Sequence, residues 1–138
     1  MSAIKHLINL EGRRALITGA TGGLGHQMAA TLAELGADLI LLDHPSSDYT
    51  QVLKSIEEIS HASVELMDCD LEDGAARSNI IDILFKMPEN LNILINNAAF
   101  VGTSNLEGWN TDFYEQSLDT WRRALAVNLT AVFDTCKG

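Results

Sequence analysis

The chain of 138 residues has only two cysteines and nine basic residues, and each scarcity excludes a class of protein. Cys69 and Cys136 are too few for a disulfide framework and lack metal-ligand spacing, so we expect both to be reduced and half-buried, with no metal site. The chain has 19 acidic residues against these nine basic ones, which gives a net charge of −10. A surface of that sign repels phosphate backbones and anionic lipid headgroups, so we expect no nucleic acid partner.

Long apolar runs are missing as well. No stretch approaches the roughly 18 apolar residues that span a bilayer, and Met1 to Glu11 lacks the apolar stretch of a signal peptide. We therefore expect no membrane association and a cytosolic location. The composition, 46% hydrophobic and 20% charged, is that of a globular core, and the length suits one domain over residues 1–138.

Four short apolar runs alternate with segments of helical spacing, which is the pattern of βα units around a parallel sheet. The strands are expected at 15–17, 38–42, 64–67 and 93–95, and a segment without regular period covers 97–117. The apolar stripes of the expected helices are Leu24, Met28, Leu32 and Leu35; Tyr49, Val52, Ile56 and Ile59; Ile80, Leu84 and Met87; and Leu118, Trp121, Leu125, Leu129, Val132 and Cys136.

These four βα units in series predict an α/β fold, a Rossmann-like doubly wound parallel sheet. Right-handed crossovers give the strand order 3-2-1-4. The crevice between the first and fourth strands is then the point where open α/β sheets bind ligands, at the carboxyl ends of their strands. Each motif described below lies at such an end.

The first strand is followed by a glycine-rich turn, Thr18-Gly-Ala-Thr-Gly-Gly-Leu-Gly25, that leads into the first helix. Glycine lets the backbone approach a pyrophosphate closely, and the free amides at a helix N-terminus attract the anion. Gly19, Gly23 and Gly25 are spaced as G-x-x-x-G-x-G, and no Gly-Lys-Ser/Thr follows, so a kinase-type P-loop is excluded. A turn that merely allows tight strand-to-helix packing is the alternative interpretation.

An acidic residue, Asp43, ends the second strand at about the 20-residue offset where a carboxylate accepts hydrogen bonds from the adenosine ribose hydroxyls. The same charge repels a 2′-phosphate, and no Lys or Arg stands within several residues of it in the sequence. This favours NAD over NADP. The alternative is that Asp43 only caps the turn with His44 and Pro45.

With these residues placed, the chain resembles the N-terminal part of the classical short-chain dehydrogenase/reductase family. The turn at 18–25 is similar to the family's T-G-x-x-x-G-x-G loop, and 96–99 resembles its N-N-A-G motif, with Ala99 in place of glycine. Residues 69–71 (Cys-Asp-Leu) are similar to the pair that follows the third strand in that family, and 127–129 (Val-Asn-Leu) to the helix that carries its asparagine.

The resemblance implies hydride transfer between a nicotinamide dinucleotide and a carbonyl or alcohol. It implies that the Asp70 side chain meets the adenine amino group, that the Leu71 backbone borders the ring, and that Asn97 braces the site. It also implies that Asn128 shapes its helix and holds a water in a proton relay to a lysine. The cofactor-binding residues are expected to be Gly19, Thr21, Gly23, Leu24, Gly25, Asp43, Asp70, Leu71, Asn97, Ala98 and Ala99. From the residues alone, Asn128 can instead be a core asparagine bonded to backbone, and Asn97 a cap on the fourth strand.

The family's serine, tyrosine and lysine centre, with its Tyr-x-x-x-Lys motif, is absent from this chain. Tyr49 and Tyr114 are the only tyrosines, and Leu53 and Leu118 stand where the lysine would be. In the family these residues follow a fifth strand, so we expect the chain to be truncated before that strand. The fourth strand then has an unpaired edge and the last helix an apolar flank, which predicts a homo-oligomer.

Three functions stay open from the sequence. The first is an NAD-dependent oxidoreductase, and the second is a catalytically inactive nucleotide-binding or self-associating module. A flavodoxin-like flavin domain is less favoured, because its phosphate loop is usually rich in hydroxyl residues. The substrate side is expected at 100–116, where Trp109, Asn110 and Asp112 suit a polyol or sugar, although Trp109 and Phe113 can equally be packing residues.

Overall fold

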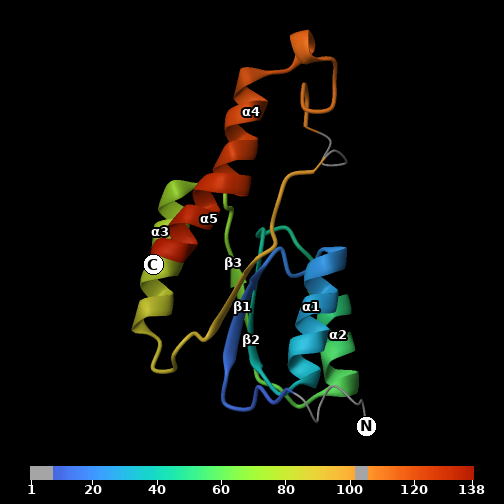
Figure 1. Ribbon diagram of the computed structural model, residues 1–138, viewed down its shortest axis with the longest axis vertical. Coiled ribbons are helices and arrows are strands. Elements are labelled where there is room, and N and C mark those ends of the chain that lie inside the picture. The colour runs from blue at the N-terminus through green and yellow to red at the C-terminus, as the bar shows by residue number, and fades with distance from the viewer. Residues whose placement is uncertain (1–7, 102–105) are drawn as a thin grey trace.

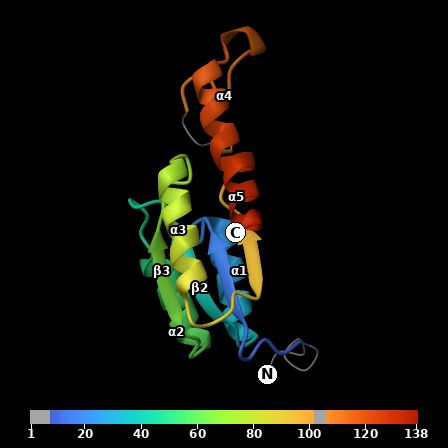
Figure 2. The ribbon, with the colours of Figure 1, turned by 90° about the vertical axis from the view of Figure 1, so that its left-hand side faces the viewer.

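The computed structural model describes residues 8–101 and 106–138. At its centre is a four-stranded parallel sheet in the order β3-β2-β1-β4 (Figure 2). The strands are β1 (Arg14–Thr18), β2 (Asp38–Asp43), β3 (Val64–Asp68) and β4 (Ile93–Asn96). The predicted strand order is confirmed, and each strand lies where the apolar runs place it.

Helices cover both faces of the sheet, so the fold is doubly wound as predicted (Figure 1). On one face lie α1 (Gly23–Glu34) and α2 (Thr50–Ile59), and on the other lie α3 (Gly74–Lys86) and α5 (Ala131–Lys137). Alternate strand residues supply the two layers: Ile17 packs toward α1 and α2, whereas Leu16 packs toward α3 and α5. A fully buried side chain of this kind contributes about 1.5–3 kcal/mol.

Local signals in the sequence set the helix ends. α1 is closed by Gly36, whose φ of 98° is the left-handed conformation that glycine adopts most readily. Asp73 caps α3, and Pro88 follows directly after its C-terminal cap. α2 begins one residue later than its apolar stripe indicates, because Tyr49 stays outside the helix as its N-terminal cap residue and reaches β3 with its hydroxyl group.

The predicted last helix is continuous but not uniform. α4 (Leu118–Leu125) runs into a π-helical turn, η3 (Ala126–Thr130), and then into α5. Asn128 lies within this turn, and π turns inside helices are frequent at functional sites. Before α4, the described part of the segment that has no regular period in the sequence includes a short 3-10 turn, η2 (Phe113–Glu115). α4 extends away from the sheet (Figure 1).

Two scarcities in the sequence have structural counterparts. Both cysteines are free, but the expectation that each is half-buried is wrong. Cys69 is buried because it continues β3 into the apolar cluster beneath α3, and Cys136 is exposed on α5. Within the described ranges, no helix is long and apolar enough to cross a membrane.

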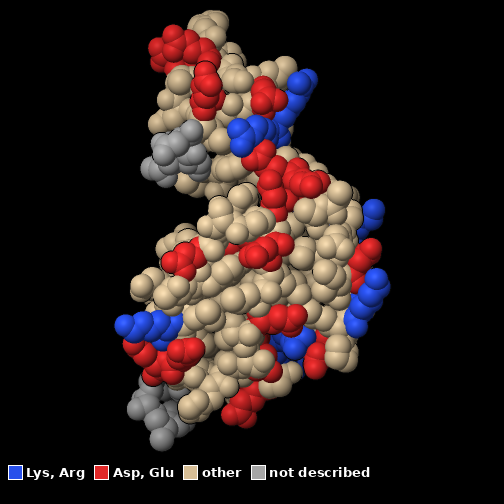
Figure 3. Space-filling model, turned by 180° about the vertical axis from the view of Figure 1, so that it is seen from behind, with Lys and Arg blue, Asp and Glu red and all other residues tan. Residues whose placement is uncertain are grey.

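Apolar side chains also lie on the outer surface. An exposed row at steps of three or four residues follows α4, η3 and α5, and β4 is an edge strand of the sheet. The row comprises Leu118, Trp121, Leu125, Leu129 and Phe133. Both features agree with the predicted apolar flank and open edge. The space-filling view shows the α4 region standing clear of the sheet-containing body, with more acidic than basic surface on this face (Figure 3).

Candidate functional site

A cavity of about 450 Å³ opens at the carboxyl ends of the strands. The strands are in register there, since Thr18 pairs with Leu42 and with Asn96, and Asp43 pairs with Asp68. The loops that follow all four strands therefore converge on one edge of the sheet. The cavity is lined by Gly19, Thr21, Gly22, Asp43, His44, Cys69, Asp70, Leu71, Glu72, Asn97, Ala98, Ala99, Phe100, Arg123 and Val127.

The glycine turn is built from very close backbone contacts. Gly19 has a φ of 65°, and a Cβ there would lie 2.8 Å from the Cα of Ala98. A Cβ on Gly25 would lie 2.1 Å from the carbonyl oxygen of Gly19, whereas one on Gly23 would meet nothing within 4 Å. Tight packing thus explains two of the three glycines. The N-terminus of α1 lies directly after the glycine turn. It has no side-chain cap and no acidic residue in its first helical turn.

Asn97 joins β4 to this turn. Its Nδ2 donates to the carbonyl oxygens of Thr18, at 3.1 Å, and of Gly19, at 3.0 Å. The backbone amides of Asn97 and Ala98 each donate to Oγ1 of Thr18 at 3.1 Å. The asparagine therefore holds the end of β1 and the start of the glycine turn in one fixed arrangement, and its role in bracing a cofactor site stays a prediction.

Asp43 points its carboxylate back toward the glycine turn. Oδ2 accepts hydrogen bonds from the backbone amide and the hydroxyl of Thr21, both at 2.8 Å. Oδ1 accepts from the amide of His44 at 2.8 Å and from Oγ of Ser47 at 2.9 Å. The alternative interpretation, a turn cap with His44, is thus visible in the structure. Binding of a ribose stays a prediction, and it would require a ligand hydroxyl to share or replace one of these donors.

On the opposite side of the cavity, charged groups hold the turn that follows β3. Oδ1 of Asp70 accepts from the backbone amide of Glu72 at 2.9 Å. The Glu72 carboxylate pairs with Arg123 of α4 through two hydrogen bonds of 2.8 Å, and the Arg123 guanidinium lies 5.9 Å from the centre of the Phe100 ring. The hydrogen bond from Arg123 lowers the pKa of Glu72, and the same bond raises the pKa of Arg123.

Asn128 holds the loop that follows β4. Its Oδ1 accepts from the amide of Phe100 at 2.7 Å, and its Nδ2 donates to the carbonyl oxygen of the same residue at 2.9 Å. The alternative of a core asparagine is wrong about burial, because Asn128 is exposed, but right about its backbone partners. The proton-relay water stays a prediction.

Most of the predicted cofactor residues line the cavity. They are Gly19, Thr21, Asp43, Asp70, Leu71, Asn97, Ala98 and Ala99. Gly23, Leu24 and Gly25 do not, because they form the first turn of α1, and the Leu24 side chain is 70% exposed in a separate groove with Ile95. The lining residues that are not among the predicted cofactor residues are Gly22, His44, Cys69, Glu72, Phe100, Arg123 and Val127, of which Phe100 belongs to the expected substrate segment.

Neither tyrosine lines the cavity. The hydroxyl of Tyr49 donates to the carbonyl oxygen of Met67 at 2.9 Å. Burial, followed by the charges of Asp68 and Asp43, raises the pKa of Tyr49, which is the opposite of what a tyrosine base needs near neutral pH. Tyr114 is 98% exposed, outside the cavity. Both tyrosines are therefore without a catalytic role in this geometry.

Within the described part of the expected substrate segment, no polar residue lines the cavity. Trp109 donates from Nε1 to the carbonyl oxygen of Val101 at 3.2 Å, which makes it a packing residue of the loop. Asn110 and Asp112 are exposed and do not line the cavity, and Phe113 is 80% exposed. Residues 102–105 lie outside the described ranges.

The doubly wound sheet with this cavity at its carboxyl edge defines a dinucleotide-type α/β fold. The family model described as short chain dehydrogenase matches residues 13–138, and the chain belongs to this family of oxidoreductases, whose members bind a nicotinamide dinucleotide. The predicted resemblance is thereby confirmed.

Three known proteins illustrate the relationship. A 2-dehydro-3-deoxy-D-gluconate 5-dehydrogenase of Bacillus subtilis is 33% identical over 96% of this chain and 48% of its own length. The solved structure of an NAD⁺-bound xylitol dehydrogenase superposes with a TM-score of 0.77 at 26% identity, over 93% of this chain and 46% of that one. A metagenomic short-chain oxidoreductase in complex with NADP gives a TM-score of 0.77 at 25% identity, over 93% and 55%. The chain thus spans about half the length of these relatives.

Proposed function

We propose that the cavity binds NAD and that the chain is the cofactor-binding part of an NAD-dependent oxidoreductase. The observation that carries the proposal is the contact between Asp43 and Thr21, which places a carboxylate directly beside the glycine turn. A dinucleotide whose phosphates occupy that turn meets this negative charge at its adenosine ribose, which disfavours a 2′-phosphate. Arg123, the one Lys or Arg among the described lining residues, is already paired with Glu72.

Each part of the proposed ligand has a group to receive it. The pyrophosphate lies against the glycine turn and the first amides of α1, formed by Gly19, Thr21, Gly23, Leu24 and Gly25. Asp70 and Leu71 receive the adenine, while Asn97, Ala98 and Ala99 support the centre of the cavity. Asn128 acts on the loop at Phe100 and on the shape of its own helix. When bound, NAD supplies the hydride acceptor for oxidation of an alcohol, or as NADH the donor for reduction of a carbonyl.

The substrate class proposed is a sugar-like alcohol or carbonyl compound. Its support comes from two relatives named for such substrates, a deoxygluconate dehydrogenase and a xylitol dehydrogenase. Among the described lining residues no side chain adds to this support, since Trp109, Asn110 and Asp112 lie outside the cavity. The reacting serine, tyrosine and lysine of the family have no counterpart in this sequence, so the proposal for this chain alone is binding rather than turnover.

A second candidate function, a nucleotide-binding module that self-associates, is favoured by the exposed apolar row on α4 to α5 and by the open edge of β4. We propose that two copies cover these surfaces, because a row of five large apolar side chains at helical spacing is suited to pack against a second helix. Sedimentation should then detect dimers or larger species at high concentration. A strictly monomeric, well-folded chain would contradict this.

Three expectations about the domain organisation, location and partners of the protein stay predictions. They are a single domain over residues 1–138, a cytosolic location, and the lack of nucleic acid, membrane and metal partners. Across the part of the chain that the structure describes, no group of three or more His, Cys, Asp or Glu is placed to hold a metal ion.

Calorimetric titration of the chain with NAD and NADP tests the cofactor proposal. We expect NAD to bind at least about tenfold more tightly than NADP, a difference of about 1.4 kcal/mol. Asp43→Asn removes the charge while keeping the shape, and it should reduce this preference. The control Asp82→Asn removes an exposed carboxylate of α3 and should preserve it. Equal or tighter binding of NADP by the unmodified chain, or no binding of NAD, would refute the proposal.

A further inference from the structure

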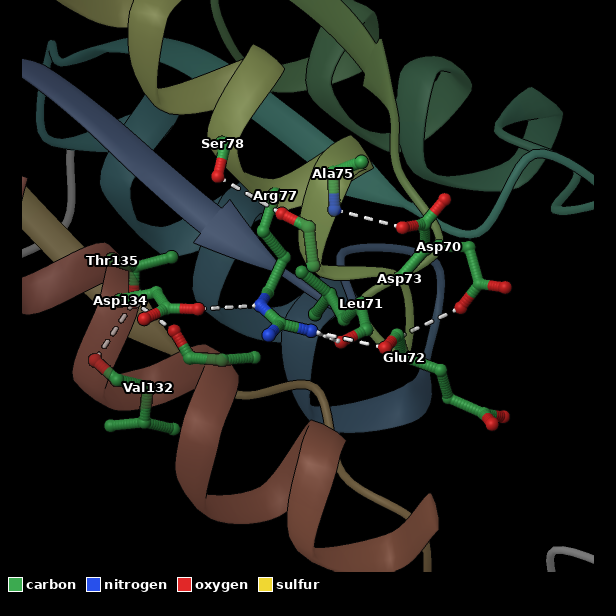
Figure 4. Close-up of polar contacts among 12 residues, drawn as sticks. Asp70, Leu71, Glu72, Asp73, Ala75, Arg77, Ser78, Val132, Asp134 and Thr135 are labelled. Carbon is green, nitrogen blue, oxygen red and sulfur yellow. Dashed lines mark hydrogen bonds and ion pairs between the residues drawn. The ribbon is translucent and has the colours of Figure 1, made fainter.

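Arg77 is a buried arginine that the proposed binding of NAD does not use directly. It belongs to α3 and is only 8% exposed (Figure 4). Its Nε donates to Oδ2 of Asp134 on α5 at 2.7 Å. Its Nη1 donates to the carbonyl oxygen of Leu71 at 2.7 Å and to that of Glu72 at 3.2 Å. The guanidinium therefore ties the turn after β3, which lines the cavity, to two helices.

The position of Arg77 on its helix is one where an apolar residue would be expected. It lies three residues before the buried Ile80, on the face of α3 that packs toward the sheet. The ion pair of a buried guanidinium often does no more than cancel the cost of removing the charge from water. An apolar side chain of similar size at this position would therefore stabilise the fold equally well. The arginine differs from an apolar side chain in its geometry, because the guanidinium donates hydrogen bonds only at fixed angles and so fixes the orientation of its partners.

One peptide group links Arg77 to the cavity. The carbonyl oxygen of the peptide between Leu71 and Glu72 accepts the hydrogen bond from Arg77, and the amide of the same peptide donates to Oδ1 of Asp70 at 2.9 Å. In a trans peptide the C=O and N–H point in opposite directions. Arg77 therefore holds one side of the peptide plane and Asp70 the other, as the dashed lines of Figure 4 trace.

This chain of contacts fixes the carboxylate of Asp70. The charged donor polarises the peptide and strengthens the hydrogen bond from the Glu72 amide to Oδ1. Among the hydrogen bonds of the described residues, the Asp70 side chain uses only Oδ1, and Asp70 lines the cavity. Oδ2 is thereby left for a donor group of a ligand.

We propose that Arg77 is a positioning residue for the adenine end of the dinucleotide site. It aims the Asp70 carboxylate at the adenine amino group through the peptide between Leu71 and Glu72, and Asp134 holds the guanidinium in place. This inference rests on the proposed binding of NAD. It goes beyond it by assigning base recognition to a residue that touches no part of the ligand.

The test compares NAD with nicotinamide hypoxanthine dinucleotide, which carries an oxygen in place of the adenine amino group. By calorimetry, the unmodified chain should bind NAD about tenfold more tightly, because a hypoxanthine oxygen cannot donate to Asp70. Arg77→Met should bring that ratio close to one. Arg77→Lys, which keeps a charged donor, should restore part of it. A residue that merely stabilised the fold would weaken both ligands equally and leave the ratio unchanged.

Two further variants separate base recognition from folding. Asp134→Asn leaves the hydrogen bonds from Arg77 to the two carbonyl oxygens in place and should keep most of the ratio. Arg13→Met makes the same chemical change at an exposed site outside the cavity and should keep the whole ratio. If Arg77→Met fails to fold, the partial ratio of Arg77→Lys carries the test. If Arg77→Met folds and keeps the full ratio, the inference is wrong while the proposed function stands. If only Arg77→Lys folds, a full ratio in that variant has the same consequence. Failure of the unmodified chain to bind either dinucleotide would instead refute the proposed function.

Discussion

Around the glycine turn the contacts come from backbone atoms, the neutral amide of Asn97 and the carboxylate of Asp43, whereas around the turn at 70–72 two guanidinium groups hold the chain in place. The first side leaves no space for a side chain at Gly19 or Gly25: an added Cβ at Gly25 would lie 2.1 Å from a carbonyl oxygen. The second side is held by Arg77, which is buried, and by Arg123, whose side chain is 44% exposed.

The difference separates two ways to shape one cavity. Steric contacts do not depend on salt or pH, and they fail abruptly when atoms are added. Ion pairs near the surface respond gradually to salt, pH and single charge changes, and each contributes little. Variants that add atoms at the glycine turn should therefore have larger effects than removal of the partly exposed Glu72–Arg123 pair.

The largest effect is expected from Gly25→Ala. The methyl group cannot be accommodated without moving α1 or the turn, so the free energy of unfolding should fall by about 1–3 kcal/mol and NAD binding should be lost. Gly23→Ala is the matched control for stability, because its Cβ meets nothing within 4 Å and the free energy of unfolding should stay unchanged. Urea denaturation and calorimetry measure the two quantities. Normal NAD binding by Gly25→Ala would break the comparison.

A smaller loss is expected from Asn97→Ala. The change removes one donor from each of the carbonyl oxygens of Thr18 and Gly19, although the Gly19 oxygen keeps the amide of Gly22. It should lower the free energy of unfolding by about 1 kcal/mol, with weaker NAD binding. The control is its neighbour Asn96, which bonds to Thr135 on the other side of β4. Asn96→Ala should leave the NAD affinity unchanged. Equal affinity losses in the two variants would show that Asn97 has no special role at the turn.

The smallest effect is expected from Glu72→Gln, which removes the ion pair with Arg123. Because this pair is partly exposed, its contribution should stay below about 1 kcal/mol and decrease in high salt. The pKa of Glu72 is lowered in the folded chain, so the stabilisation should be complete above the ordinary glutamate pKa of about 4.3 and disappear as the pH falls below it.

Urea denaturation at several pH values compares Glu72→Gln with Glu57→Gln, which changes an exposed glutamate of α2 away from the cavity. The difference between the unmodified chain and Glu72→Gln should shrink toward acid, while the control should follow the unmodified chain. A large, salt-independent loss in Glu72→Gln would mean that this side of the cavity is not held by surface charge.

The same contrast explains what could be predicted from the sequence. The glycine turn and the motif around Asn97 are local strings of residues beside strands, so their place in the fold followed once the strand order was inferred. The ion pairs that hold the turn at 70–72 join residues far apart in the sequence. Glu72 and Arg123 are 51 positions apart, and Arg77 and Asp134 are 57 positions apart. Nothing local marks such partners.

Two details had partial signals in the sequence. Arg77 stands on the apolar stripe of its helix, three residues before Ile80, and a charged residue there indicates a buried partner. From the sequence Asn128 can be a core asparagine, but it lies where the helix shifts to π geometry at 126–130, and there it is exposed and bonded to the Phe100 backbone. No periodicity of 3.6 residues predicts that shift.

The most direct measurement is an NMR titration of the isotope-labelled chain with NAD. The central claim is that the dinucleotide occupies the cavity between the two turns. The amides of Thr21, Leu71 and Ala98 should then shift together with one dissociation constant, equal to that from calorimetry, while Gln27 and Thr31 in the groove beside α1 stay unchanged. Shifts confined to that groove or to the exposed apolar row, with none at the cavity, would contradict the account.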